Sequence, residues 1–167
     1  DMTVDEWRES YLGGKFTEAP SFNVHSGNFT VRAGDSESYN LADDGFLTDV
    51  KDQGSCGSCW AFSATETIET AWAKAGNDLT EFSPQQIVSC DVDFGDFGCQ
   101  GGMPATAMDY VKQAGGLATE ADYPYTSGNG VTGECVDPTS LISGGSVSTW
   151  EYATPDCAYG TEACIED

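Results

Sequence analysis

The sequence predicts an α+β domain in which helices fill the middle of the chain and short β-prone pieces follow them. Three segments between about residues 59 and 114 carry helix start and stop signals. The chain after Leu117 is rich in Gly, Ser and Thr, with short β-prone runs. With 167 residues and a hydrophobic fraction of 39%, the chain can supply one ordinary core.

The first 34 residues form a stretch that we expect to be separate from the rest. Thr3 can cap a short helix, with Glu6 completing a capping box three residues later, and Gly13-Gly14 would end that helix. From Thr17 to Asp44 the composition is rich in Ser, Asn, Gly and Asp, which predicts extended or loop-like chain.

Three helices are predicted in the middle of the chain. The first begins after Ser58 and runs to about Ala75, because its apolar residues recur three or four positions apart. The second follows Ser83-Pro84, a capping hydroxyl with proline at the first helical position, and ends near Cys90. The third covers 104–114 and is closed by glycine. Beyond them, residues 145–150 are β-prone.

The charge balance limits the possible partners. The chain has 28 acidic and 6 basic residues and a net charge of −22. Such a polyanion repels phosphate, so nucleic acid and anionic membranes are poor partners. No apolar run approaches the ~20 residues needed to cross a bilayer. A solvated acidic surface explains the charge, and adaptation to salt or attraction of cationic substrates are the alternatives.

Seven cysteines and 20 glycines predict a loop-rich, disulfide-stapled protein of an oxidising compartment. Asp1 is not an initiator, and nothing before Glu18 resembles a signal peptide. A secretory signal would therefore be already removed or outside this sequence. Asn28-Phe29-Thr30 is a glycosylation sequon, which makes Asn28 a candidate modification site.

The pair Cys56-Gly57-Ser58-Cys59 admits three interpretations. A zinc site would need a second close pair or two histidines, and Cys90 and Cys99 are nine apart, so no metal is expected. A redox dithiol usually follows a buried strand, but residues 43–52 are too charged for one. The third interpretation is a nucleophile.

A nucleophile at Cys59 has the neighbours that its chemistry needs. The residue lies in the first turn of the best predicted helix, where free N–H groups and the macrodipole favour a thiolate. A thiolate that attacks a carbonyl needs donors for the developing oxyanion. Gln53 offers a side-chain amide six residues earlier, and the N–H of Cys59 offers a second donor. These parts suit acyl transfer.

The segment Cys56-Gly57-Ser58-Cys59-Trp60 resembles the signature of the papain and cathepsin family of cysteine proteases. Further landmarks resemble that family in order along most of the chain. They are Val50-Lys51-Asp52-Gln53-Gly54, Ala61-Phe62-Ser63, Phe82-Ser83-Pro84-Gln85-Gln86, Ser89-Cys90-Asp91, Gly98-Cys99-Gln100-Gly101-Gly102-Met103-Pro104 and Tyr123-Pro124-Tyr125. The resemblance implies a papain-like fold, with a helical lobe and the start of a β-rich lobe.

Residue roles follow from this resemblance. Cys59 would be the nucleophile and Gln53 the side-chain donor of the oxyanion hole. The residues implied in substrate binding are Gly57, Trp60, Gly101, Gly102, Met103 and Pro104. The alternatives are an ordinary turn at Gly101-Gly102 and plain core packing of Met103.

The resemblance also implies a disulfide pairing. Removing one free thiol from the seven cysteines leaves three bridges. The implied pairs are Cys56 with Cys99, Cys90 with Cys135, and Cys157 with Cys164. Cys56 would then be a staple that fixes Cys59.

The resemblance also implies a division of the chain. Residues 1–34 would be the end of an inhibitory propeptide and its linker, and 35–167 a truncated peptidase domain. The family's catalytic His and Asn follow the cysteine by about 130–150 residues, beyond Asp167. His25 precedes the cysteine, and we interpret it as an exposed linker residue. We therefore expect the chain to be a fragment that is inactive alone.

The leading hypothesis is a cysteine endopeptidase, made as a zymogen in the secretory pathway and located in a lysosome or vacuole or secreted. Its implied partners are peptide or protein substrates, its own propeptide and cystatin-like inhibitors, and we expect a monomer without cofactors. One alternative is a non-catalytic homologue that binds peptides or inhibitors. A small inhibitor module built on the propeptide is a third possibility, which the intact segment around Cys59 disfavours.

Overall fold

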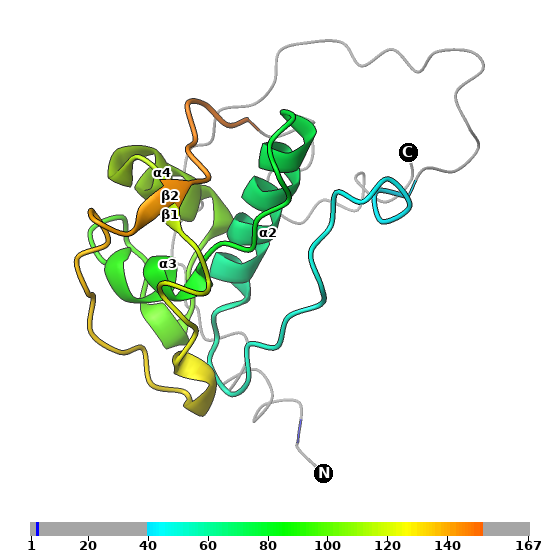
Figure 1. Ribbon diagram of the computed structural model, residues 1–167. Helices are drawn as coiled ribbons and strands as arrows, with labels where there is room; N and C mark the ends of the chain where they lie inside the picture. Colours follow the sequence, from blue (N-terminus) through cyan, green and yellow to red (C-terminus); the bar gives the residue numbers. More distant parts are fainter. Residues whose placement is uncertain (1–2, 4–39, 152–167) are drawn as a thin grey trace.

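The computed structural model describes residue 3 and residues 40–151 (Figure 1). In chain order its elements are α2 (Cys59–Lys74), α3 (Pro84–Cys90), η2 (Gly98–Gln100), α4 (Pro104–Ala114), β1 (Leu117–Ala118), η3 (Ser127–Asn129) and β2 (Ile142–Gly144). The expected α+β class is confirmed, since these residues form three α-helices and an antiparallel pair of short strands. The helix expected after Thr3, the sequon at Asn28, His25, and the pair Cys157 and Cys164 lie outside the described residues.

All three predicted helices are confirmed. α3 begins as its start signal predicts, because the Ser83 hydroxyl accepts a hydrogen bond from the Gln86 N–H at 3.1 Å and Pro84 occupies the first turn. α4 ends at Ala114, and the next residue, Gly115, has φ of 89°, the left-handed conformation expected of a helix stop. α2 ends at Lys74, one residue before the predicted end.

The β-prone run at 145–150 does not form a strand. The strand is β2, which precedes that run, and it pairs with β1 through Leu117 opposite Gly144 and Ala118 opposite Ile142. β1 is two residues long, so the ladder is short. Gly145, with φ of 61°, then turns the chain away from the sheet.

The core lies between α2, α3, α4 and the strand pair. Figure 1 shows α2 beside this group, with the extended segment 45–53 running along the other side of the helix. Alanines 61 and 64 of α2 are fully buried, and small side chains there let α4 and α3 approach closely. The largest buried side chains include Phe82, Ile87 and Leu117.

An ion pair holds the extended segment against α2. Lys51 Nζ donates to Glu69 Oε2 at 2.7 Å, and the Thr48 hydroxyl donates to the same oxygen at 2.6 Å. Glu69 Oε1 accepts the Phe82 N–H at 2.8 Å, so one buried carboxylate joins the segment, the helix and the start of the next element. Gln53 follows two residues after Lys51, and this anchor therefore sets its position.

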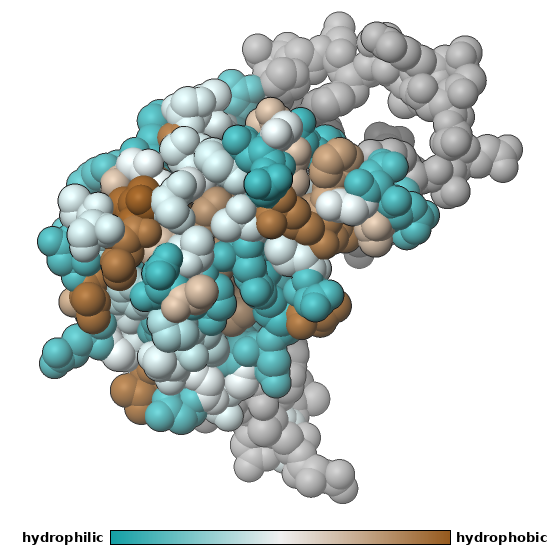
Figure 2. Space-filling model, viewed as in Figure 1, coloured by the Kyte–Doolittle hydropathy of each residue, from teal (hydrophilic) through white to brown (hydrophobic). Residues whose placement is uncertain are grey.

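The face drawn in Figure 2 is mostly hydrophilic, with apolar side chains in small separate patches. Val50, Leu47 and Phe97 are among the exposed large hydrophobic residues. In the described part of the chain, no helix combines the length and the apolar character needed to cross a bilayer.

Candidate active site

Cys59 is the first residue of α2, and its thiol is free and exposed. Ser58, the residue before it, does not cap the helix with its side chain; its carbonyl accepts the N–H groups of Ala61 and Phe62. The N–H groups of Cys59 and Trp60 donate to no described residue. The sulfur therefore lies at a helix N-terminus whose first donors are open.

The two cysteines of the motif differ in their chemistry. Cys56 is fully buried and bonded to Cys99, while Cys59, three residues on, keeps a free thiol. A second disulfide joins Cys90 to Cys135. These are two of the three pairs that the resemblance implies. Because Cys56 is locked, the motif cannot work as a redox dithiol in this state.

Gln53 is half-buried and its side chain is anchored. Its Nε2 donates to the Cys56 carbonyl at 2.8 Å. An amide nitrogen has two protons, so one remains for another acceptor. The loop is held further along, where the Ser55 N–H donates to Gly128 O at 2.9 Å. Gln53 is thus presented by a fixed loop, with one donor to spare.

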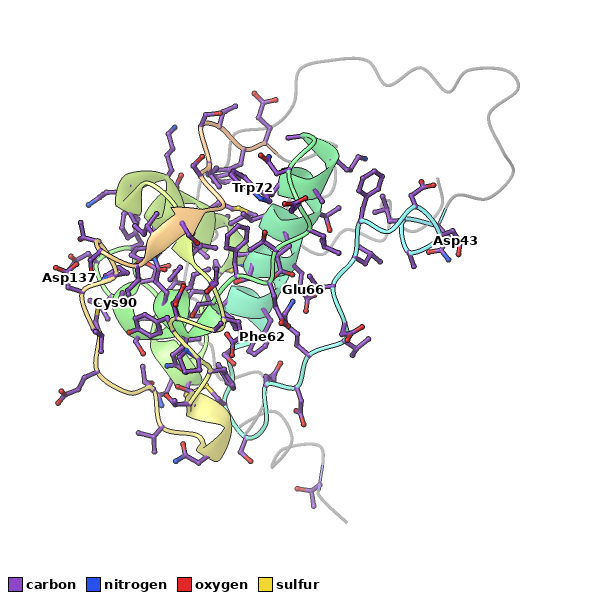
Figure 3. All side chains as sticks on the ribbon, in the orientation of Figure 1. Asp43, Phe62, Glu66, Trp72, Cys90 and Asp137 are labelled. Carbon is purple, nitrogen blue, oxygen red and sulfur yellow. A yellow bond between two sulfur atoms is a disulfide. The ribbon has the colours of Figure 1, made fainter. Side chains whose placement is uncertain are left out.

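Gln53 and Cys59 line the same groove of about 880 Å³ between α2 and the extended segment. Figure 3 shows Phe62 and Glu66 on the side of α2 that faces this segment, whereas Cys90 and Asp137 lie on the far side of the helices. Opposite α2, the apolar lining of the groove comes from Leu47 and Val50 of this segment and from Leu41 just before it. An exposed thiol and an amide donor therefore meet in one concave surface.

Gly101 and Gly102 are glycines for different reasons. Gly101 has φ of 111°, and its carbonyl accepts the Phe97 N–H at 2.9 Å. A Cβ on Gly102 would lie 2.4 Å from the Trp60 ring and 2.7 Å from Asp96 Oδ1. Neither the N–H nor the C=O of Gly102 is hydrogen-bonded to another described residue. Gly102 therefore has backbone groups available to an extended ligand.

Trp60, Met103, Pro104 and Gly57 are the other residues expected to bind substrate. The buried Trp60 ring packs against Gly102, and its Nε1 donates to Gly98 O at 3.2 Å. Met103 and Pro104 are half-buried at the start of α4, and Met103 is not part of the buried core cluster. The Gly57 N–H donates to Cys99 O at 3.0 Å, next to the Cys56–Cys99 disulfide, so this N–H already has an acceptor within the protein.

A pair of buried carboxyls supports the same segment. Asp96 Oδ1 accepts the Met103 N–H at 2.8 Å. Asp91 is 1% exposed and Asp96 4% exposed, and both oxygens of Asp91 and Oδ2 of Asp96 lack a protein donor. Burial, the hydrogen bond to Asp96 and the charges of Asp96, Asp109 and Asp93 raise the pKa of Asp91 to about 9. Burial also raises the pKa of Asp96.

Because the pKa of Asp91 is raised to about 9, its carboxyl keeps a proton at neutral pH, and that proton is available to an oxygen of Asp96. Sequence reasoning did not identify Asp96, since it lies five positions after Asp91 and nothing in the pattern shows that both are buried. It also missed the role of Tyr125, whose hydroxyl reaches residues 67 and 72 positions earlier. In the described ranges, no three His, Cys, Asp or Glu side chains gather in a way that could hold a metal ion.

A helix-terminal thiol, an anchored amide donor and an open glycine backbone are the parts that thiol-dependent acyl transfer uses. Residues 36–161 match the family described as papain family cysteine protease, and this chain belongs to that family.

Similar proteins occur in plants and in a protozoan. The chain is 41% identical over 133 residues to the oryzain gamma chain of Oryza sativa subsp. japonica, covering 78% of this chain and 36% of the relative. It is 39% identical over 153 residues to cysteine proteinase B of Leishmania mexicana, covering 88% and 34%. It is 49% identical over 88 residues to pro-cathepsin H of Medicago truncatula, covering 53% and 25%. The chain thus spans about a third of the length of the curated relatives it matches.

Proposed function

We propose that this chain carries the nucleophilic half of a cysteine endopeptidase. The Cys59 thiolate attacks the scissile carbonyl carbon, and the carbonyl π electrons move onto oxygen to give a tetrahedral oxyanion. Collapse expels the amine, which takes a proton from a general acid, and leaves an acyl group on Cys59. Water then attacks that thioester, releases the acid and restores the thiol.

The observation that carries this proposal is the contrast between the two cysteines, since Cys56 is bonded to Cys99 and Cys59 is free and exposed. In the proposed oxyanion hole, the spare proton on Gln53 Nε2 and the Cys59 N–H donate to the developing charge. Both residues line one groove, which supports their joint action.

The proposed substrate is an extended peptide that passes Gly102. The free N–H and C=O of Gly102 can pair with the peptide backbone in the manner of an added strand. The Trp60 ring packs against that glycine, and Met103 and Pro104 supply apolar surface beside it. The Met103 side chain would then contact the residue that lies next to the paired one.

The general base is proposed to come from outside residues 40–151, because no histidine lies within that range. The relatives extend well beyond the part that this chain matches, which supports a base carried elsewhere in the whole protein. The groove lined by Leu41, Leu47 and Val50 is the surface against which that part would pack. On this account the chain alone does not turn over peptides.

The same proposal covers processing and location. Residues 1–34 would be the end of a propeptide, and one relative is a pro-cathepsin. The two disulfides fit an oxidising compartment, so the secretory pathway, ending in a lysosome, vacuole or the outside, is proposed. Peptide substrates and inhibitors of the cystatin kind are the proposed partners.

The test compares two reactions of Cys59 in the chain as it stands. Acetylation by p-nitrophenyl acetate passes through an oxyanion, whereas alkylation by iodoacetamide does not, and peptide mass spectrometry locates both products. The Gln53→Ala variant should lower the ratio of acetylation to alkylation at Cys59 about tenfold or more, as loss of an oxyanion donor does elsewhere. The exposed Gln113→Ala on α4 is the matched control. An unchanged ratio in Gln53→Ala would contradict the proposal.

A further inference from the structure

Tyr125 joins the two parts of the proposed oxyanion hole through one hydroxyl. The hydroxyl lies 2.8 Å from the backbone carbonyl oxygen of Gln53 and 2.8 Å from the Ser58 hydroxyl. Ser58 immediately precedes Cys59 at the start of α2. The loop that presents the amide donor and the helix that presents the thiol are thus bridged by a residue far along the chain.

The direction of the hydrogen bonds in this bridge follows from what each group can do. A carbonyl oxygen only accepts, so the Tyr125 proton goes to Gln53 O. The phenol has no second proton, and the Ser58 hydroxyl must therefore donate to Tyr125. Burial, with the charges of Asp52 and Glu120, raises the pKa of Tyr125, which keeps its proton in place at neutral pH.

Tyr125 itself is held from two other sides. Its N–H donates to Glu120 Oε1 at 2.7 Å, which fixes the backbone. Its ring meets Phe62 of α2 edge to face, with centroids 4.9 Å apart and an interplanar angle of 76°. Because the ring and the backbone of Tyr125 are both held in place, its hydroxyl has a fixed position. The hydrogen bonds of this hydroxyl therefore fix the positions of Gln53 and Ser58.

Gln53 is therefore held by hydrogen bonds through both its side chain and its backbone. Its side-chain nitrogen donates to Cys56 O, and Cys56 is tied by its disulfide. Its backbone oxygen accepts from Tyr125. Without the second contact the residue can rotate about the first, and its spare amide proton moves away from the groove. A donor displaced by about 1 Å loses much of its effect on a transition state.

We propose that Tyr125 is a positioning residue for the oxyanion hole, acting through Gln53 and Ser58 without contacting the substrate. This inference rests on the proposed function, because it assigns Tyr125 a task in the same acyl transfer. Nothing in the proposal requires the phenol to exchange its proton during the reaction.

The test uses Tyr125→Phe in the full chain, with Tyr123→Phe as the matched control. Tyr123 belongs to the same Tyr-Pro-Tyr run, and its hydroxyl accepts the Val136 N–H at 2.9 Å, beside the Cys90–Cys135 bridge. Each variant deletes one hydrogen-bonded phenol oxygen and keeps the ring. The measured quantity is again the ratio of acetylation to alkylation at Cys59, taken in buffer in which urea unfolding curves show that each variant is folded.

The ratio should fall about tenfold in Tyr125→Phe and change less than about twofold in Tyr123→Phe. Equal ratios in the two variants would overturn the inference. If Gln53→Ala also leaves the ratio unchanged, the proposed function fails; if Gln53→Ala lowers it and Tyr125→Phe does not, only the role of Tyr125 fails. The Ser58→Ala variant tests the same bridge from its other end, because it removes the Ser58 hydroxyl and keeps the Tyr125 phenol. It should lower the ratio, by less than Tyr125→Phe, and no fall at all would count against the bridge.

Discussion

Gly102 packs against the Trp60 ring in the proposed substrate surface. The glycine lies so near the indole that a Cβ would fall 2.4 Å from a ring carbon. The ring in turn donates to Gly98 O and is almost fully buried. The backbone that a peptide would pair with is therefore set by one aromatic side chain.

The Gly102→Ala variant should lose about 1–3 kcal/mol of unfolding free energy, because the added methyl forces Trp60 or Asp96 out of place. Urea denaturation measures the loss. Gly128→Ala is the control, since a Cβ there meets nothing closer than a Tyr125 ring carbon at 3.8 Å. Equal stabilities for the two variants would contradict this prediction, because they would mean that Trp60 and Asp96 can move aside for the methyl group at little cost.

Single residues were predictable where chemistry is local and unpredictable where it is not. Cys59 and Gln53 could be singled out because a helix start and a nearby amide are visible in one short segment. Tyr125 could not, because its hydroxyl meets Gln53 only after the chain folds back across 72 positions. The buried state of Asp91 and Asp96 depends in the same way on α4 and the core around them.

The extended segment and α2 behave as one unit through Glu69. This carboxylate is 1% exposed and accepts from Lys51, Thr48 and the Phe82 N–H. Since Gln53 is two residues from Lys51, the position of the amide donor depends on the ion pair.

Glu69→Gln leaves the Lys51 charge buried without a counterion, so it should cost about 3–5 kcal/mol of stability. Glu66→Gln, three residues earlier on the same helix and exposed, should change stability by less than about 0.5 kcal/mol. Thermal or urea unfolding of both variants measures the difference. A loss in Glu69→Gln no larger than that in Glu66→Gln would argue that solvent reaches Lys51.

Helices were predictable and strands were not, for a physical reason. Local sequence was enough for the helices, because α3 has the Ser83-Pro84 start signal, α4 has Gly115 as its stop signal, and α2 has an apolar face. β2 pairs with β1, whereas residues 145–150 are not assigned to a strand despite their β-prone composition.

At the scale of the whole molecule, buried acids make stability depend on pH. The pKa of Asp91 is raised to about 9, and burial also raises the pKa of Asp96 and of Glu120. An acid whose pKa is higher in the folded state binds its proton more tightly there. Its contribution is fully present below its unfolded pKa of about 4 and is lost as the pH rises through the folded value.

The chain should therefore be more stable at pH 5 than at pH 8, with a slope of up to about 1.4 kcal/mol per pH unit for each proton concerned. Asp91→Asn places a permanent donor beside Asp96, so it should raise stability at pH 8 and flatten the slope. Urea midpoints between pH 5 and 8 measure both effects. The exposed Asp137→Asn should leave the slope as it is. A steeper slope in Asp91→Asn would refute the shared proton.

The most direct test of the account is the release of p-nitrophenolate when the disulfide-intact chain meets p-nitrophenyl acetate, with and without enough urea to unfold it. We predict one fast equivalent per folded chain, with the acetyl group on Cys59, and a much slower reaction at that sulfur once the chain is unfolded. The same rate in both states, or an acetyl group found first on another residue, would mean that the fold does nothing to activate this thiol.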